Sequence, residues 1–265
     1  MSEYKMPQLK HPDRLFIGGE WVQPNSGRQL EIVSPDTEQV VGHVAEADEK
    51  DMDRAVAAAR EAFDHGPWPW LSPRERIEAM ERLVAALTRR HPELAEAWSL
   101  QMGGLQTTAP YLVQRGTSNL EDAIRLGKEF EFIRKAPSAA SPVAYVVHEP
   151  VGVVAAIAPW NVPYMIMAAK LAPALLTGCT VVMKPSPETP LEAYIIAECA
   201  EEAGIPAGVI NLVPGHREAA DHLVNNPGID KVSFTGSTLA GKRIAEVCGS
   251  RIARCTLELG GKSAA

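Results

Sequence analysis

The chain has 265 residues, a length that allows one large domain or two small ones. Hydrophobic residues make up 46% and charged residues 22%, which excludes a disordered chain and supports a substantial core without disulfide or metal staples. Acidic residues outnumber basic ones by 33 to 26, and the net charge of −7 argues against a nucleic-acid-binding protein, which normally presents a basic face.

Cysteine usage indicates a reducing compartment. The four cysteines are scattered and no two have Cys-x-x-Cys spacing, so we expect free thiols in a cytoplasmic protein. The N-terminal residues contain no apolar stretch, and we expect no secretory signal. The histidines show no metal-ligand spacing with each other or with cysteine, so no metal site is predicted.

The first 133 residues mix short strands with helices. Alternating runs among prolines and glycines predict small strands and turns up to about residue 45. A strong helix start follows at Ser72, where Glu75 completes a capping box. Further helices are expected over 92–102, ended by the glycines that follow, and less regularly over 120–133.

Residues 134–150 change in character. Residues 134–142 are rich in Pro, Ser and Ala and predict a linker, whereas Val143 to His148 predicts an exposed strand. Because a bare strand edge tends to pair with another chain, we expect a small β arm that mediates oligomerisation.

Residues 151–259 alternate apolar strands with helices. Continuous apolar strands of this kind are buried on both faces, which predicts an α/β fold with a doubly wound parallel sheet. In such sheets ligands bind beyond the carboxyl ends of the strands. The expected strands are 151–158, 180–183, 209–213, 231–235 and 256–259, and the expected helices are 164–177, 190–203, 217–225 and 237–248.

An uncharged stretch over residues 151–169 approaches the ~20 residues that a membrane-spanning helix needs. Pro159, Asn161 and Pro163 lie at its centre, where proline breaks a helix and asparagine is unfavourable in lipid. A buried strand, a polar turn and a helix are therefore predicted, and no association with a membrane.

Two strand ends carry candidate polar groups. Prolines fix the backbone on both sides of Asn161, so its side-chain amide is either a turn residue or a rigid donor to an oxyanion. Lys184, followed by Pro185, Ser186 and Pro187, is either a solvated lysine in a proline-rich loop or a ligand for ribose or phosphate oxygens.

Small residues open the helix after the fourth strand. The segment from Gly236 to Lys242 matches Gly-x-x-x-x-Gly-Lys, but Arg243 stands where a P-loop needs Ser or Thr to hold Mg²⁺. The Rossmann Gly-x-Gly-x-x-Gly pattern is also missing. The spacing favours phosphate binding over ATP hydrolysis, and the alternative is a helix start with a small N-cap residue.

Glu258 is flanked by leucines in the fifth expected strand. Burial there would raise its pKa toward the range of a general base. The alternative is an edge-strand carboxylate paired with Lys262 or Arg254.

Taken together, these strand ends resemble the NAD(P)-dependent aldehyde dehydrogenase superfamily. The resemblance rests on Pro-Trp-Asn at 159–161, Lys-Pro-Ser at 184–186, Phe-Thr-Gly-Ser at 234–237 and Leu-Glu-Leu-Gly-Gly-Lys at 257–262. It implies oxidation of a small-molecule aldehyde to a carboxylate through a thioester, in a homo-oligomer that is a dimer or tetramer. It assigns 1–133 and 151–259 to a Rossmann-like cofactor domain, 134–150 to the arm, and 260–265 to the start of a catalytic domain.

The resemblance also implies roles for single residues. Asn161 would be the oxyanion donor, Glu258 the base that activates water, and Lys170 a residue linked to proton movement. Trp160 and Gly215 would line the cofactor cleft. The implied cofactor-binding residues are Ile157, Ala158, Pro159, Trp160, Lys184, Ser186, Pro187, Gly215, Phe234, Thr235, Gly236, Ser237, Leu259 and Gly260.

Two departures from the family pattern change these expectations. Many members have a ribose-binding glutamate three residues after the lysine, where this chain has Pro187, with Glu188 one place later. Both NAD and NADP therefore remain possible cofactors. The family's nucleophilic cysteine lies beyond the base, and none of the cysteines here matches its motif.

Cys255 is three residues from Glu258, so the two side chains should point to opposite faces of the sheet. We therefore expect the chain alone to be inactive. A dinucleotide-binding or assembly module, acting alone or with a partner, is the alternative function, and a P-loop nucleotide binder is a weaker one.

Overall fold

A seven-stranded sheet forms the centre of the computed structural model, which describes residues 6–262. The strand order is β11-β10-β7-β8-β9-β1-β2. The parallel strands are β7 (Val153–Ile157), β8 (Thr180–Lys184), β9 (Ile210–Leu212), β10 (Lys231–Gly236) and β11 (Arg254–Leu259). An antiparallel hairpin, β1 (Leu15–Ile17) and β2 (Glu20–Val22), extends the sheet. The structure confirms the predicted α/β class with a doubly wound parallel sheet.

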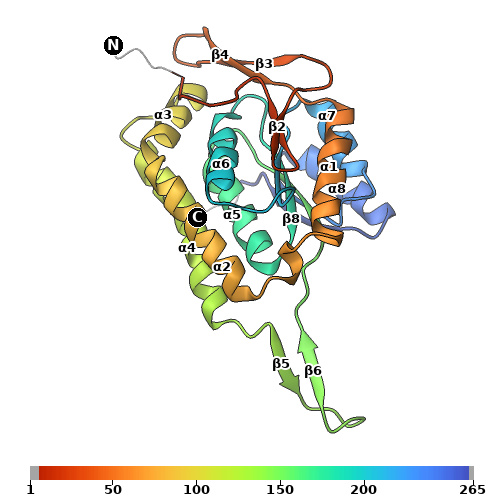
Figure 1. Ribbon diagram of the computed structural model, residues 1–265. Helices are drawn as coiled ribbons and strands as arrows, with labels where there is room; N and C mark the ends of the chain where they lie inside the picture. The colour runs from red at the N-terminus through yellow and green to blue at the C-terminus, as the bar shows by residue number, and fades with distance from the viewer. Residues whose placement is uncertain (1–5, 263–265) are drawn as a thin grey trace.

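Helices cover both faces of this sheet (Figure 1). One face carries α1 (Glu49–Asp64), α7 (Arg217–Asn225) and α8 (Thr238–Ser250). The other carries α5 (Pro163–Thr177) and α6 (Leu191–Glu202), and outside them α2 (Pro73–Arg89), α3 (His91–Met102) and α4 (Ala109–Glu129). A short 3-10 helix, Trp68–Trp70, lies between α1 and α2.

Alternation along β7 divides the core in two. Val154 and Ala156 pack in the cluster under α5 and α6, whereas Val153, Ala155 and Ile157 pack in the cluster under α1, α7 and α8. Every residue of β7 is buried, which explains the uninterrupted apolar run in the sequence.

The predicted helix starts and stops are largely confirmed. Ser72 caps α2 in a capping box with Glu75, and Gly103 ends α3 in the left-handed conformation at φ 76°. The predicted range for α4 was wrong, because the helix occupies 109–129 and not 120–133. Its buried stripe includes Gly116, where a Cβ would come within 2.5 Å of the Tyr164 ring of α5, so the stripe lacks the usual apolar signal.

The end of α8 was also predicted too early. The helix runs through Gly249 to Ser250, and β11 begins at Arg254 and not at residue 256, because six residues of β11 pair with β10. The other strands and helices of this region differ from the prediction by at most two residues at an end.

The expected linker forms a strand. β5 (Ile133–Ala136) pairs antiparallel with β6 (Ala144–Val147), and this hairpin projects away from the body of the molecule (Figure 1). The prediction that 134–142 is entirely linker was therefore wrong, because the basic residues of β5 lie on a solvent-exposed hairpin. A second hairpin, β3 (Gln29–Val33) and β4 (Val40–Ala45), lies at the opposite end of the molecule.

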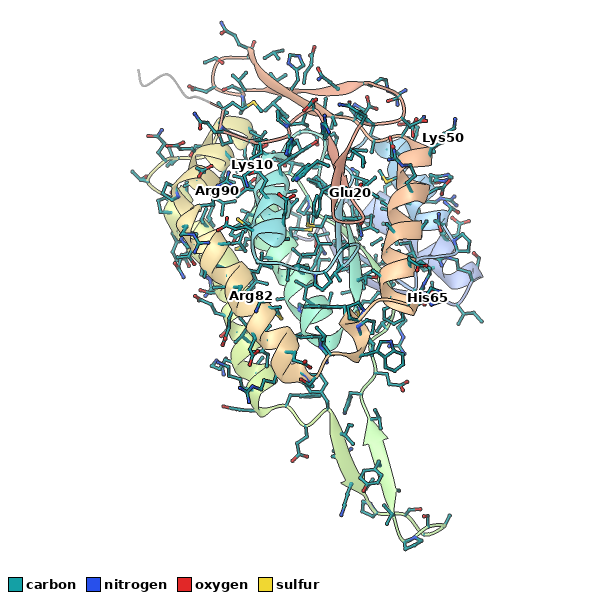
Figure 2. All side chains as sticks on the ribbon, in the orientation of Figure 1. Lys10, Glu20, Lys50, His65, Arg82 and Arg90 are labelled. Atoms are coloured by element: carbon teal, nitrogen blue, oxygen red, sulfur yellow. The ribbon has the colours of Figure 1, made fainter. Side chains whose placement is uncertain are left out.

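Glu198 holds the N-terminal segment to the body. Its buried carboxylate accepts hydrogen bonds from the main-chain N–H of Lys10 at 2.6 Å and from Arg90 at 2.7 Å. Lys10 and Arg90 lie on the same side of the molecule in Figure 2.

Across residues 6–262, every helix is too short or too polar to span a bilayer.

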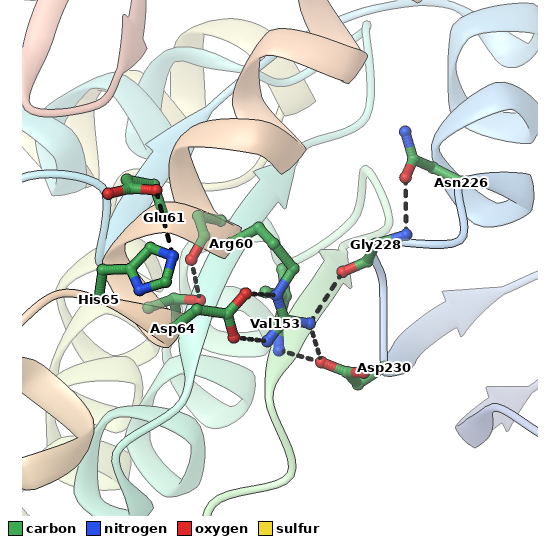
Figure 3. A network of polar contacts seen from close by, with 10 residues as sticks. Arg60, Glu61, Asp64, His65, Val153, Asn226, Gly228 and Asp230 are labelled. Atoms are coloured by element: carbon green, nitrogen blue, oxygen red, sulfur yellow. Dashed lines mark hydrogen bonds and ion pairs between the residues drawn. The ribbon is translucent and has the colours of Figure 1, made fainter.

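Arg60 joins α1 to the amino-terminal edge of the sheet (Figure 3). It forms ion pairs with Asp64 of its own helix and with Asp230, which precedes β10. Asp230 in turn accepts a hydrogen bond from Val153 N at 2.8 Å. Gly152 leaves room for that carboxylate, because a Cβ at this position would lie 1.8 Å from it. The network fixes the edge opposite to the one where ligands bind in such sheets.

Candidate functional site

The carboxyl ends of β8, β7 and β10 bring three predicted site residues into one row. Lys184 pairs in register with Ile157, and Ile157 pairs with Phe234. The chain proceeds from β7 through β8 to β9 in one direction and then returns to β10 and β11 on the other side of β7. The topological switch point therefore lies between β7 and β10, which is where an open α/β sheet binds its ligand.

A cleft of about 660 Å³ opens at this switch point. Ile157 and Phe234 line its inner end, and α7 and α8 form its walls. The residues that the helices contribute are Glu49, Arg217, Glu218, Ala220, Asp221, Val224, Leu239, Ala240, Arg243 and Ile244. The volume is in the range of small-molecule and cofactor sites.

Ser237 begins α8, and Arg243 lines the α8 wall of the cleft. Ser237 is the N-cap of α8 and its hydroxyl accepts a hydrogen bond from Ala240 N at 3.2 Å, an arrangement that is compatible with both expectations for this segment. Arg243 pairs with Asp221 of α7 at 3.0 Å and links the two walls. Beside this helix start, Leu259 pairs with Gly236, and Gly260 follows it. The first N–H groups of α8 and the positive end of its dipole therefore point toward the carboxyl edge of the sheet.

Asn161 lies in the turn between β7 and α5. Its Oδ1 accepts the N–H of Val162 at 2.9 Å, and its main-chain oxygen accepts the indole N–H of Trp98 at 2.9 Å. Asn161 is exposed, and within residues 6–262 its Nδ2 makes no hydrogen bond, so this group can donate to a ligand. Pro159 and Trp160 precede it, and the Trp160 ring is exposed.

Lys170 lies on α5, and its side chain reaches the face of β10 that points toward α5. The side chain is 8% exposed and its ammonium donates to Ser233 at 3.2 Å and Thr235 at 2.9 Å. Burial lowers the pKa of Lys170 to about 8, although the nearby Glu258 carboxylate opposes that shift. With a pKa this close to neutral, the amine of Lys170 can take up and release a proton.

Lys184 ends β8, and the loop that follows carries Ser186 and Pro187. Lys184 is 6% exposed, and burial lowers its pKa to about 8 against the opposing effect of Glu188. The Ser186 hydroxyl donates to the Glu188 carboxylate. Gly215, in the neighbouring turn before α7, is buried, and a Cβ there would lie 2.8 Å from the carbonyl oxygen of Ala47.

Comparison with known proteins agrees with this arrangement. The model of the aldehyde dehydrogenase family matches residues 21–265. The chain belongs to the aldehyde dehydrogenase family. It is 46% identical over 252 residues to geranial dehydrogenase from Castellaniella defragrans, covering 95% of this chain and 53% of that protein. It is 41% identical over 264 residues to aminoacetaldehyde dehydrogenase from Pseudomonas aeruginosa, covering 97% and 52%.

Solved structures of the family have the same fold. A Pseudomonas syringae aldehyde dehydrogenase with NAD⁺ and octanal superposes with a TM-score of 0.91 at 38% identity, covering 98% of this chain and 52% of that one. A Mycobacterium tuberculosis aldehyde dehydrogenase with NAD⁺ gives 0.90 at 38%, covering 97% and 53%. The chain spans about half the length of the curated relatives it matches.

Glu258 differs from its prediction. In this chain it is exposed, because β11 is the edge strand of the described sheet, so the predicted burial was wrong and the edge-strand position of the alternative is confirmed. Among residues 6–262 no ion pair joins it to Lys262 or Arg254. Glu258 pairs in register with Thr235, a partner of Lys170, so these three residues share one face of the sheet.

The structure also contributes residues that the sequence did not single out. The α7 and α8 side chains that line the cleft are alanines, single Val, Leu and Ile residues, and charged side chains, and none is chemically unusual. Ala220 and Val224, one turn apart on a helix that the sequence did predict, are the one signal that could have identified this wall. Trp98 was missed because it lies 63 residues from Asn161.

Proposed function

We propose that residues 6–262 form the cofactor-binding half of an aldehyde dehydrogenase that oxidises an aldehyde to a carboxylate with NAD or NADP. The observation that carries the proposal is the cleft at the switch point, with Lys184, Ile157 and Phe234 in one row beside it. Two solved relatives with the same fold hold NAD⁺, which supports a dinucleotide as the occupant.

The residues present fit a dinucleotide. The apolar inner end and helix walls of the cleft suit an adenine ring, and the buried ammonium of Lys184 would donate to the ribose. Gly236, Ser237 and the start of α8 would hold the pyrophosphate, since a helix N-terminus offers free N–H groups to an anion. Residues 157–160, Thr235, Gly215, Leu259 and Gly260 would complete the surroundings of the cofactor.

Asn161 and Lys170 would serve the chemical step. We assign Asn161 Nδ2 to the oxyanion that forms when a thiolate adds to the aldehyde carbon, because Oδ1 is fixed by Val162. A bound nicotinamide would supply the acceptor for the hydride of this carbon. Glu258 would then direct water at the thioester, and Lys170, on the same face, would hold or release a proton near it.

None of the four cysteines suits the role of nucleophile. Cys179, Cys199 and Cys248 are buried, and burial raises the pKa of Cys199 to about 12. Cys255 is exposed but lies beside Cys248 of α8, on the other face of β11 from Glu258. We infer that the nucleophile comes from a catalytic domain outside residues 6–262, into which residues 260–265 lead, and that 1–133 and 151–259 form the cofactor domain.

The hairpin of β5 and β6, within residues 134–150, would join two copies of the chain. Ile133 lies opposite Val147 and Lys135 opposite Tyr145, so these four side chains share one face of the hairpin. Their three apolar members are exposed. Such a face supports a homo-oligomer, a dimer or tetramer. The free thiols support a reducing compartment such as the cytoplasm.

Calorimetric titration of the purified chain with NAD tests the proposal. We expect binding, and we expect Ser237→Trp to abolish it by filling the space at the start of α8. The matched control is Ser250→Trp at the exposed far end of the same helix, which should bind normally. Absence of binding by the unmodified chain would contradict the proposal, as would sustained aldehyde oxidation that Cys255→Ser abolishes.

A further inference from the structure

Two of the four cysteines lie on adjacent elements, α8 and β11. Cys248 is in the last turn of α8 and is 1% exposed, whereas Cys255 is near the start of β11 and is exposed. The chain between them reverses in a short turn, in which the N–H of Ala253 donates to the carbonyl oxygen of Cys248 at 2.9 Å. Ile252 adopts the left-handed conformation there, at φ 57°, which is unusual for a β-branched residue. The turn brings the start of β11 back beside the end of α8.

The side chain of Cys255 lies on the face of the sheet that α8 covers. Cys255 pairs in register with Val232 of β10, so these two side chains point to the same face. Val232 packs in the cluster under α1, α7 and α8, and Cys248 belongs to the same cluster. The register and the core packing therefore direct both thiols into the layer between α8 and the sheet.

The packing of α8 along β11 brings the two cysteines to the same height. At the start of the helix, Gly241 packs on Leu259, whose side chain a Cβ on the glycine would overlap. From this contact the helix rises about 10 Å to Cys248, and the strand extends about 13 Å back to Cys255. Burial raises the pKa of the Cys248 thiol, and the neighbouring Cys255 thiol raises that pKa further. The two thiols are therefore neighbours.

We propose that Cys248 and Cys255 form a dithiol site that a small-molecule disulfide, such as oxidised glutathione, converts to a disulfide within the chain. Neither cysteine lines the cleft, so the inference goes beyond the proposed function and does not depend on it. The bond would join the end of α8 to the edge strand β11 and would remove the exposed thiol of that strand.

The reaction is two successive thiol–disulfide exchanges. The exposed Cys255 thiolate attacks one sulfur of oxidised glutathione, the bond between the two glutathione sulfurs breaks, and the first glutathione leaves and takes up the proton that Cys255 lost. Cys248 then attacks the Cys255 sulfur as its thiolate, and the second glutathione leaves with the Cys248 proton. The two cysteines are oxidised by two electrons, and the small disulfide is reduced to two thiols. Cys248 reacts second because it is buried and forms the thiolate less readily.

Mass spectrometry of the purified chain after incubation with oxidised glutathione tests the proposal. We expect the intact mass to fall by two hydrogen atoms, with no glutathione retained. Trypsin cuts after Arg251 and Arg254, between the two cysteines, so a digest without reductant should contain peptides 244–251 and 255–262 joined by a disulfide. Dithiothreitol should separate these peptides and restore the original mass.

Three variants separate the two steps from general thiol oxidation. Cys248→Ala should stop the reaction after the first exchange and retain one glutathione on Cys255. Cys255→Ser should gain neither glutathione nor the bond, because the remaining cysteines are buried. Cys199→Ala, the matched control at a buried cysteine of α6, should form the bond as the unmodified chain does.

Several results with the unmodified chain would overturn the inference. They are a glutathione adduct that persists on Cys255, a bond between the Cys255 residues of two chains, a bond to Cys179 or Cys199, and no reaction at all. Because no nicotinamide nucleotide is present in this experiment, its failure is distinct from a failure of the proposed function, which calorimetry with NAD would report.

Discussion

The indole of Trp98 on α3 donates a hydrogen bond to the main-chain oxygen of Asn161 at 2.9 Å. A few residues along the same helix, Gln101 donates to the buried Glu192 and accepts the N–H of Leu191. The outer helix α3 thus contacts both the turn that carries Asn161 and the start of α6. The orientation of the proposed oxyanion donor therefore depends on a helix that does not touch the cleft.

Removing the Trp98 donor should loosen this turn. Trp98→Phe keeps an aromatic ring but loses the hydrogen bond, and we expect unfolding free energy to fall by about 1 kcal/mol. Binding of NAD should be unchanged, whereas kcat of a complete enzyme carrying the change should fall. Urea denaturation and calorimetry measure the first two. Trp70→Phe, at a ring that is 81% exposed, is the control that should change neither.

Glu192 should make stability fall as pH rises. Burial raises its pKa to about 8, while in the unfolded chain it titrates near 4.5. The native state therefore keeps a proton that the unfolded state releases, so stability is greatest below pH 4.5 and is lost up to about pH 8. The shift corresponds to roughly 5 kcal/mol. In Glu192→Gln this part of the pH dependence should be absent, and an unchanged slope would contradict the assignment.

Lys170 should have the opposite dependence. Its native pKa of about 8 lies below the unfolded value of 10.5, so the unfolded state binds more protons between these values and stability rises with pH. Compared with Lys170→Met, the unmodified chain should gain about 3 kcal/mol between pH 7 and 10.5. Lys50→Met, at an exposed lysine labelled in Figure 2, should show no such gain.

The Arg60 network should support stability without affecting the cofactor site. Arg60→Leu leaves Asp230 and Asp64 without their cation, and we expect a loss of about 2 kcal/mol in unfolding free energy. Binding of NAD should stay the same because the network lies at the other edge of the sheet. Arg74→Leu removes an exposed pair with Glu78 and should lose no more than about 0.5 kcal/mol.

The apolar face of the arm should control assembly. Replacing Tyr145 and Val147 together with aspartate places charge on that face, and light scattering should then report a monomer where the unmodified chain is an oligomer. Arg134→Gln, on the opposite face of the hairpin, should leave the mass unchanged. A monomeric unmodified chain would rule out the arm as an interface in this chain.

The sequence predicted the features that follow from local chemistry and from the parallel sheet. Lys184 and Phe234 come together because the strands that carry them both flank β7, and that arrangement follows from alternating strands and helices. For Glu258 the sequence left a buried base and an edge-strand carboxylate both open, because edge position depends on the order of strands and not on the flanking leucines. The α4 range was missed because Gly116 and Gly127 lie on the buried face of the helix, where the sequence would otherwise show apolar side chains. Gly116 packs against Tyr164 of α5, and Gly127 packs against Leu176 of α5.

The edge strand β11 has a practical consequence for the chain in solution. Within the described sheet, β11 pairs with β10 on one side, and its other side offers six residues of unpaired backbone with Leu259 partly exposed. Such an edge is a template for a strand of another molecule. Concentrated samples of this chain should therefore aggregate edge to edge, and dilute samples should be preferred for the binding measurements.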